Sequence, residues 1–192
     1  MAKRKSLYTK YGDTGFTNLL YGGRISKASL HCEAYGAVDE ATSALGLARS
    51  LSNDLVIQTT LKNIEIDLFT VAAELATDPE KYDMFKKYFK PVTAEMVDNA
   101  ETLIDDFQAK IDLPRSFIIP GGSAASAAID LGRSTVRRAE RNTVRLAEDE
   151  KLVNPEIIKY LNRIGDLLFI MARYQDRDTH MEKLSDNNPR VQ

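Results

Sequence analysis

The sequence has no tryptophan, one cysteine and two histidines among its 192 residues. A lone cysteine, Cys32, excludes an internal disulfide and is typical of a reducing compartment. Neither His31 nor His180 follows a glutamate by three residues, the spacing that helical di-iron sites use. We therefore expect no metal ion held by the protein's own side chains.

Long apolar runs are also missing, since none approaches the roughly 20 residues that a membrane-spanning helix needs. The N-terminal segment MAKRKSLYTKYGD is basic but has no apolar run behind it, which is not the pattern of a signal peptide. A net charge of −2 gives no general attraction to nucleic acid or anionic membranes. We expect a soluble, cytoplasmic protein without a nucleic-acid or membrane partner.

What the sequence does contain is apolar residues at helical spacing over most of its length. Hydrophobic residues make up 43% of the chain, enough for one domain over residues 1–192. The pattern predicts an all-α, five-helix antiparallel bundle, with 77–91 as a polar connection and 175–192 as a flexible tail. The predicted helices cover about 33–50, 54–75, 94–107, a segment after the Pro-Gly-Gly turn that ends near 148, and 155–174.

Arginine is concentrated in FIIPGGSAASAAIDLGRSTVRRAERNTVR, residues 117–145. At 100° per residue, small and apolar side chains form the core face of this predicted helix. The opposite, solvent-facing side carries Arg138, Arg141 and Arg145, and the flank between the two faces carries Arg133, Arg137 and Glu140.

The last predicted helix has a similar polar flank, formed by Asn162, Asp166, Phe169 and Arg173. Asp39 lies on the flank of the first helix. These residues allow two interpretations. They form ordinary ion pairs at the core boundary, such as Asp39 with Arg133, or they meet a ligand or a neighbouring subunit.

The N-terminal arm, residues 1–30, contains YTKYGDTGFTNLLYGGRISK, which is rich in glycine, threonine and basic residues. Glycines let successive amides turn toward an anion, and hydroxyls and lysine neutralise phosphate oxygens. No Gly-Lys-Ser/Thr follows, so this is not a Walker loop. On composition alone, a turn-rich arm without a ligand is an equally good interpretation.

Four segments, in order, resemble the PduO-type ATP:cob(I)alamin adenosyltransferases. They are YTKYGDTGFT, AYGAVDEATSALG, FIIPGGSAASAAIDLGRSTVRRAER and LNRIGDLLFIMAR. The resemblance implies a ferritin-like five-helix subunit that assembles as a homotrimer, with active sites between adjacent subunits. It also implies transfer of the 5′-deoxyadenosyl group of ATP to the cobalt of reduced cobalamin, which forms adenosylcobalamin and triphosphate.

The substrates implied are ATP, with Mg²⁺ bound mainly through its phosphates, and cob(I)alamin formed from cob(II)alamin. A cobalamin reductase and a B12-dependent enzyme are the implied protein partners. An alternative function is an ATP- and corrin-binding carrier or chaperone that delivers the cofactor to such an enzyme.

Residue roles carried over from the resemblance fall into three groups. The polyphosphate contacts are Thr9, Lys10, Gly12, Asp13, Gly15, Thr17 and Lys27, and the remaining ATP contacts are Arg137, Glu140 and Asn162. The cobalamin contacts are Phe117, Asp166 and Phe169, and the catalytic set is Arg137, Phe117 and an Arg133–Asp39 pair.

Two places differ from the family pattern. Ser29, Leu30 and His31 stand where the family has Asp, Pro and Arg, and Thr42 replaces an asparagine. Phe117 has two interpretations. It is either a core residue of an extended segment, or its ring faces the corrin and keeps water and the cofactor's own base from the lower face of cobalt.

Overall fold

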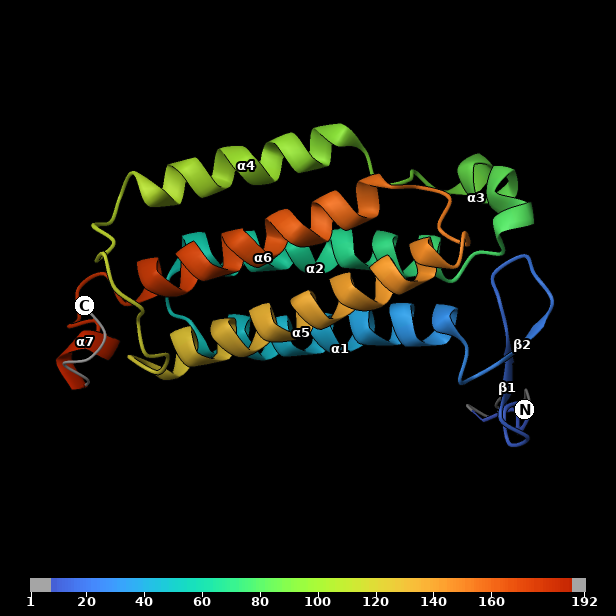
Figure 1. The fold of residues 1–192 in the computed structure, drawn as a ribbon, viewed down its shortest axis with the longest axis horizontal. Coiled ribbons are helices and arrows are strands. Elements are labelled where there is room, and N and C mark those ends of the chain that lie inside the picture. Colours follow the sequence, from blue (N-terminus) through green and yellow to red (C-terminus); the bar gives the residue numbers. More distant parts are fainter. Residues whose placement is uncertain (1–7, 188–192) are drawn as a thin grey trace, which may run out of the picture.

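The computed structural model of the chain describes residues 8–187 and is predominantly helical (Figure 1). In chain order the elements are β1 (Phe16–Asn18), β2 (Arg24–Ser26), α1 (Leu30–Leu51), α2 (Leu55–Leu75), the short 3-10 helix η1 (Pro79–Lys81), α3 (Tyr82–Tyr88), α4 (Ala94–Gln108), α5 (Ala124–Glu148), α6 (Glu156–Gln175) and α7 (Leu184–Asn187). The five predicted helices correspond to α1, α2, α4, α5 and α6.

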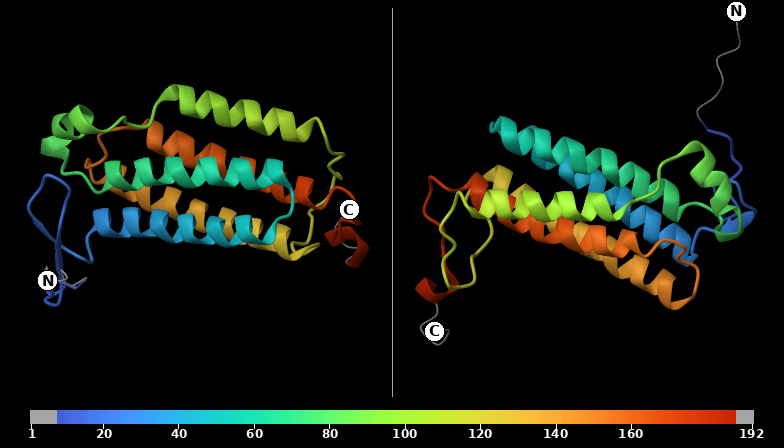
Figure 2. Two further views of the ribbon diagram at one scale, coloured as in Figure 1. Left: turned by 180° about the vertical axis from the view of Figure 1, so that it is seen from behind. Right: turned by 90° about the horizontal axis from the view of Figure 1, so that it is seen from above.

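The long helices lie side by side along one common direction (Figures 1 and 2). Helix α1 packs against α2 and α5, α6 packs against α5, and α4 covers the outer side of α6. Gly132 of α5 makes the close α1–α5 approach possible, since a Cβ there would lie 2.6 Å from Cδ2 of Leu45. No helix among residues 8–187 is long and apolar enough to cross a membrane.

Helix starts follow local capping chemistry. The carboxylate of Asp54 accepts from the backbone amides of Val56 and Ile57, and the hydroxyl of Thr93 accepts from the backbone amide of Met96. Helix α6 begins one residue later than predicted, with Pro155 at the N-cap, although the side chain of Asn154 still accepts from the amide of Glu156.

The first helix begins earlier than its apolar pattern indicates. Ser29 caps α1 by accepting from the amide of Cys32, so the helix starts at Leu30 instead of near 33. His31, at the second position of α1, is buried, and its Nδ1 lies 2.9 Å from the carbonyl oxygen of Leu75. The serine and histidine that depart from the family pattern therefore cap α1 and attach it to the end of α2.

Two parts of the prediction need correction. The chain is not wholly α, because β1 and β2 form an antiparallel hairpin that pairs Thr17 with Ile25. The predicted polar connection 77–91 contains η1 and α3, and the Leu20–Thr77 bridge connects it to the hairpin. Both elements are short, so neither produces a periodic signal long enough to be recognised in the sequence.

The C-terminal segment also differs from the flexible tail that the sequence predicts. Within the described residues it folds back to form α7 and an antiparallel bridge between Ile118 and Lys183. The predicted tail residues 188–192 and arm residues 1–7 lie outside the described part of the chain.

The candidate residues are distributed over the length of the molecule. The hairpin lies at one end, and the segment that leads into α5 lies at the other, beside α7 (Figure 1). Within one chain, the N-terminal arm and Phe117 are therefore far from each other along the bundle.

Candidate functional site

The polar flanks of α5 and α6 contact each other within the chain. The amide nitrogen of Asn162 donates to Oε1 of Glu140 at 2.9 Å, and Arg163 donates to Oδ1 of Asn162 at 2.8 Å. Arg137 is exposed one turn from Glu140, and its Cγ lies against Gly165, where an added Cβ would sit 3.5 Å away. Three of the predicted ATP contacts thus share one polar strip along the α5–α6 groove.

Further along the same groove, Arg133 lies over the ring of Phe169, with Cζ 5.4 Å from the ring centroid. Its Nε is buried and has no hydrogen-bond partner among the described residues. A buried donor without a partner is uncommon and identifies a place where a ligand group can bind.

The extended segment before α5 supplies Phe117, which is 76% exposed. Burial in the core, one of the two interpretations of this residue, is therefore wrong. The backbone carbonyl of Phe117 accepts from the amide of Leu184 at 2.8 Å, and the amide of Ile119 donates to the backbone carbonyl of Glu182 at 2.9 Å. The C-terminal segment thus holds the backbone of this loop while the ring remains free.

A hollow of about 700 Å³ opens beside Phe117. Its walls combine apolar and cationic side chains: Arg115, Ser116, Phe117, Ile118, Pro120, Asp130, Arg133, Phe169 and Arg173. A second hollow, of about 490 Å³, lies between α4 and α6, and Phe169 and Asp166 are among its lining residues. Phe169 belongs to both hollows.

The loop between Phe117 and α5 requires glycine. Gly121 has a φ of +114°, which side chains rarely adopt, and a Cβ at Gly122 would lie 2.4 Å from the carboxylate of Asp176. Ser123 then caps α5 in a reciprocal capping box with Ser126. This turn and its cap fix where the Phe117 segment joins the arginine helix.

At the other end, the N-terminal arm forms a shallow hollow of about 550 Å³. Thr9, Gly12, Thr17 and Lys27 of the predicted phosphate contacts are among its lining residues. A Cβ added at Gly12 would lie 2.8 Å from Nζ of Lys27, so a side chain there would displace the lysine ammonium. The lysine ammonium therefore lies directly over the glycine backbone.

The other arm residues flank this hollow. Gly15 adopts a φ of +79° and Lys10 one of +59°, the turn conformations that orient amides toward one side. Asp13 is exposed, and Lys10 lies over the ring of Tyr8. The geometry is that of an open anion-binding turn.

Asp39 does not reach Arg133 within the chain. It is exposed on α1, and the neighbouring ion pair of that helix joins Glu40 to Arg138. Because α1 and α5 are antiparallel with Leu45 at Gly132, Asp39 lies level with Arg138 and not with Arg133. The sequence pattern predicts that Arg138, Arg141 and Arg145 all face solvent. Arg141 and Arg145 are exposed as predicted, whereas Arg138 forms an ion pair with Glu40.

The sequence analysis missed the buried pair of Arg173 and Asp130. Arg173 is 2% exposed and donates to the Asp130 carboxylate. Burial raises the pKa of Asp130, and the charges of Arg173 and Arg133 oppose that shift. The flank position of Arg173 on α6 was the available signal, but its partner is 43 residues away.

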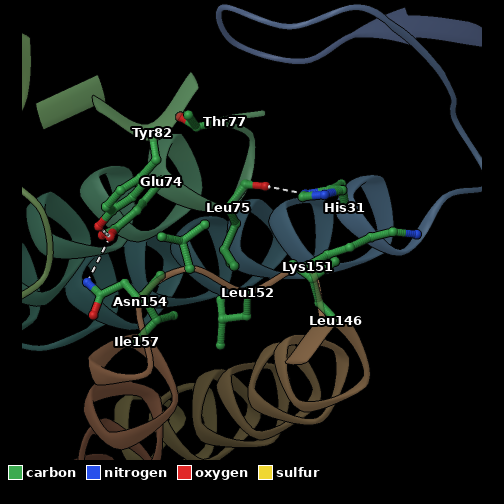
Figure 3. A pocket seen from close by; sticks show the side chains of 11 residues that line it. His31, Glu74, Leu75, Thr77, Tyr82, Leu146, Lys151, Leu152, Asn154 and Ile157 are labelled. Atoms are coloured by element: carbon green, nitrogen blue, oxygen red, sulfur yellow. Dashed lines mark hydrogen bonds between the residues drawn. The ribbon is translucent and has the colours of Figure 1, made fainter. Parts of the chain in front are cut away.

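A small enclosed pocket at the hairpin end is structural. It has about 10 Å³ of free space, at most one water molecule, and Glu74 beside it is fully paired (Figure 3). Glu74 accepts from the hydroxyl of Tyr82, from Nδ2 of Asn154 at 2.7 Å and from the amide of Val92 at 2.9 Å. This network connects α2, α3 and the starts of α4 and α6.

The fold is thus a helical bundle with a glycine- and lysine-containing turn at one end and a hollow lined by arginine and aromatic residues at the other. The family model described as cobalamin adenosyltransferase matches residues 7–175. The chain therefore belongs to the cobalamin adenosyltransferase family.

Two curated relatives agree with this assignment. The corrinoid adenosyltransferase PduO of Salmonella typhimurium is 36% identical over 179 residues, which cover 93% of this chain and 52% of that protein. The chain thus spans about half the length of this relative. The corrinoid adenosyltransferase of Bacillus subtilis is 39% identical over 173 residues, with 87% of this chain and 84% of that protein covered.

Solved structures give the same result. A variant of the PduO-type ATP:corrinoid adenosyltransferase from Lactobacillus reuteri, complexed with cobalamin and ATP, superimposes with a TM-score of 0.80 at 32% identity. The match covers 88% of this chain and 90% of that one. Another variant, complexed with ATP, gives a TM-score of 0.78 and the same identity, with 88% and 93% covered.

Proposed function

We propose that this chain is an ATP:cob(I)alamin adenosyltransferase. The observation that carries the proposal is the exposed ring of Phe117 beside a hollow whose other walls include Arg133 and Phe169. Family membership and the relatives complexed with cobalamin and ATP support the same assignment.

In the proposed reaction, cobalt(I) attacks the 5′ carbon of ATP, a cobalt–carbon bond forms, and the carbon–oxygen bond to triphosphate breaks. Triphosphate leaves with the electron pair of that bond. Cobalt(I) is already a strong nucleophile, so no general base is needed. The protein's task is to align the two reactants and to stabilise the departing anion.

The residues divide this task by their chemistry. Lys27 and the turn amides around Gly12 and Gly15 hold the triphosphate, with Mg²⁺ bound mainly through its oxygens. Arg137 forms a two-pronged contact with phosphate oxygens, for which a guanidinium is better suited than an ammonium. Glu140 and Asn162, already paired at 2.9 Å, orient the nucleoside.

The corrin lies against Phe117 in the large hollow, with Phe169 in another wall and Asp166 in the adjoining hollow. The apolar ring of Phe117 keeps water and the cofactor's own base away from the lower face of cobalt. Cobalt(II) without a lower ligand is easier to reduce, so a reductase can supply cobalt(I).

We also propose that the five long helices form one subunit of a trimer whose sites lie between subunits. Two features support this. Within one chain, the N-terminal arm and the segment before α5 that carries Phe117 lie at opposite ends of the helical bundle. A second chain is therefore needed to bring the phosphate loop and the corrin hollow together. Asp39 is unpaired with Arg133 within the chain, which leaves it available to Arg133 of a neighbouring copy.

The outer face of α1 and α5 supports such an interface. Leu47 and Leu131 are 51% and 54% exposed. Each is seven residues from the Glu40–Arg138 pair, toward the same end of the bundle, because the two helices are antiparallel. Exposed leucines next to each other favour contact with another protein surface. Light scattering that reports a monomer at working concentration would contradict this assembly.

The activity is tested by incubating the protein with ATP, Mg²⁺ and chemically reduced cobalamin. The corrin spectrum and released triphosphate are followed over many turnovers. An adenosyltransferase forms both products well beyond one equivalent of protein. Tight binding with no more than one turnover would indicate the carrier function instead.

A further inference from the structure

Phe169 is held in an unusual way. Its half-buried ring is contacted by two guanidinium groups, with the Cζ atoms of Arg133 and Arg173 each 5.4 Å from the centroid. It also lines both the hollow beside Phe117 and the hollow between α4 and α6. The orientation of this one ring therefore sets the shape of the wall that the two hollows share.

Arg173 is four residues after Phe169 on α6, so the two side chains are neighbours on one helix face. It is only 2% exposed, which leaves almost no surface to touch a ligand. Its charge is paired with the carboxylate of Asp130 on α5. Although Arg173 is one of the residues that line the hollow beside Phe117, so little of it is exposed that its main effect on a ligand passes through another residue.

A buried ion pair is a costly way to join two helices, because both charges lose their hydration. Asp130 reflects this cost, since burial raises its pKa despite the two nearby arginines. An apolar pair would connect α5 and α6 equally well. Retention of a charged pair directly behind an aromatic wall of the hollow points to a requirement for the flat, cationic face of the guanidinium.

We propose that Arg173, held in place by Asp130, is a positioning residue that fixes the ring of Phe169 and thereby the orientation in which the corrin binds. This inference rests on the proposed function. Asp130 holds the Arg173 guanidinium, which contacts the ring of Phe169 together with that of Arg133. Loss of the support lets Phe169 turn and changes both hollows together.

The test compares Arg173→Lys with wild type. Lysine keeps the charge beside Asp130 but cannot offer a flat face to the ring. We expect KM for the corrinoid to rise roughly 3- to 30-fold, as loss of a cation–π contact in a dry site implies, with KM for ATP within about twofold. With ATP present, the spectrum of bound cob(II)alamin should also lose part of the signal of four-coordinate cobalt(II), the form without a lower ligand.

A double-mutant cycle decides whether the effect passes through Phe169. In a Phe169→Leu background, Arg173→Lys should have little further effect on corrinoid KM, because the supported ring is already gone. Asp130→Asn, which keeps the shape of the side chain, should act in the same direction as Arg173→Lys and replaces it in the cycle if the lysine variant does not fold. The matched control is Arg49→Lys, in an ion pair with Glu65 that lines neither hollow.

The proposal is overturned if the variants only lower the melting temperature, or if the effects at 173 and 169 simply add. Failure of the proposed function looks different, because wild type itself would then form no adenosylcobalamin. In that case the cobalt(II) binding spectra of the variants still decide between a positioning and a purely structural role.

Discussion

The two ends of the molecule differ in whether their buried polar groups have hydrogen-bond partners among the described residues. At the hairpin end, Glu74 receives three hydrogen bonds and the pocket beside it is nearly filled. At the Phe117 end, Nε of Arg133 and Oδ1 of Asp176 are buried without a hydrogen-bond partner in the described part of the chain, and the ring of Phe117 lines a large hollow.

The difference indicates that the hairpin-end core is complete within one chain, whereas the Phe117 end is shaped for a ligand. Buried polar atoms without a hydrogen-bond partner cost stability unless something binds to them. Substitutions around Phe117 should therefore change function with little effect on folding. Substitutions around Glu74 should do the reverse.

Phe117→Ala should have the largest effect on turnover. Loss of the ring opens the lower face of cobalt and misplaces the corrin, which we expect to lower kcat on the order of 100-fold. The melting temperature should stay within a few degrees of wild type, because the side chain is mostly exposed. Steady-state kinetics and thermal melts measure both, and an early-melting variant with normal turnover per folded molecule would reverse the comparison.

Arg137→Lys should have the next largest effect on activity. An ammonium cannot hold two phosphate oxygens in fixed geometry, and loss of one charge-assisted hydrogen bond costs about 1.5–3 kcal/mol, which lowers kcat/KM about tenfold or more. Arg145→Lys is the control, since that residue is exposed on the opposite side of α5. Equal effects at the two positions would show that the flank of α5 is not the ATP face.

Glu74→Gln tests whether the hydrogen-bonded core at the hairpin end is needed for stability and not for activity. Each orientation of the amide leaves one of its N–H groups facing another donor, either the Val92 amide or the Asn154 side chain. We expect roughly 1–3 kcal/mol less stability in urea unfolding, with turnover per folded molecule unchanged. Glu80→Gln, an exposed neighbour, should lie within about 0.5 kcal/mol of wild type.

Asp67→Asn should have the smallest effect on stability, and the size of that effect depends on pH. Burial raises the pKa of Asp67, although the Tyr160 hydroxyl that donates to it at 2.7 Å opposes the shift. Because the folded-state pKa lies above that of the unfolded chain, ionisation of Asp67 costs stability at neutral pH. That cost disappears as the pH falls through the folded-state pKa.

Asparagine keeps an acceptor for Tyr160 and carries no charge. The variant should therefore be at least as stable as wild type at pH 7, and its advantage should shrink on acidification. Melting temperatures measured from pH 7 down to pH 4 follow the difference. A wild type that gains on the variant as the pH rises would contradict the assigned direction of the pKa shift.

Local signals account for the parts of the fold that the sequence predicted. The long helices follow from apolar periodicity and from caps such as Asp54 and Thr93, which act within a few residues. The exposure of Arg141 and Arg145 follows from helical geometry alone. These features depend on neighbours in the chain, so the sequence is sufficient.

Other features depend on how distant segments meet. The Glu40–Arg138 pair is set by the register of α1 against α5, and Arg173 meets a carboxylate from another helix. The α3 helix and the β1–β2 hairpin are too short to produce a period. For the site, the sequence pattern indicates the polar flanks of α5 and α6. It does not indicate that the arm and the segment before α5 lie at opposite ends of the bundle.

The central claim is that one chain's arm and another chain's α5 build each active site. The most direct measurement mixes two inactive variants, Lys27→Ala and Arg137→Ala, under conditions that allow subunits to exchange. The account predicts that activity returns to about a quarter of wild type in an equal mixture, because a quarter of the sites then combine an intact arm with an intact α5. Activity that stays at the sum of the two variants, despite demonstrated exchange, would contradict it.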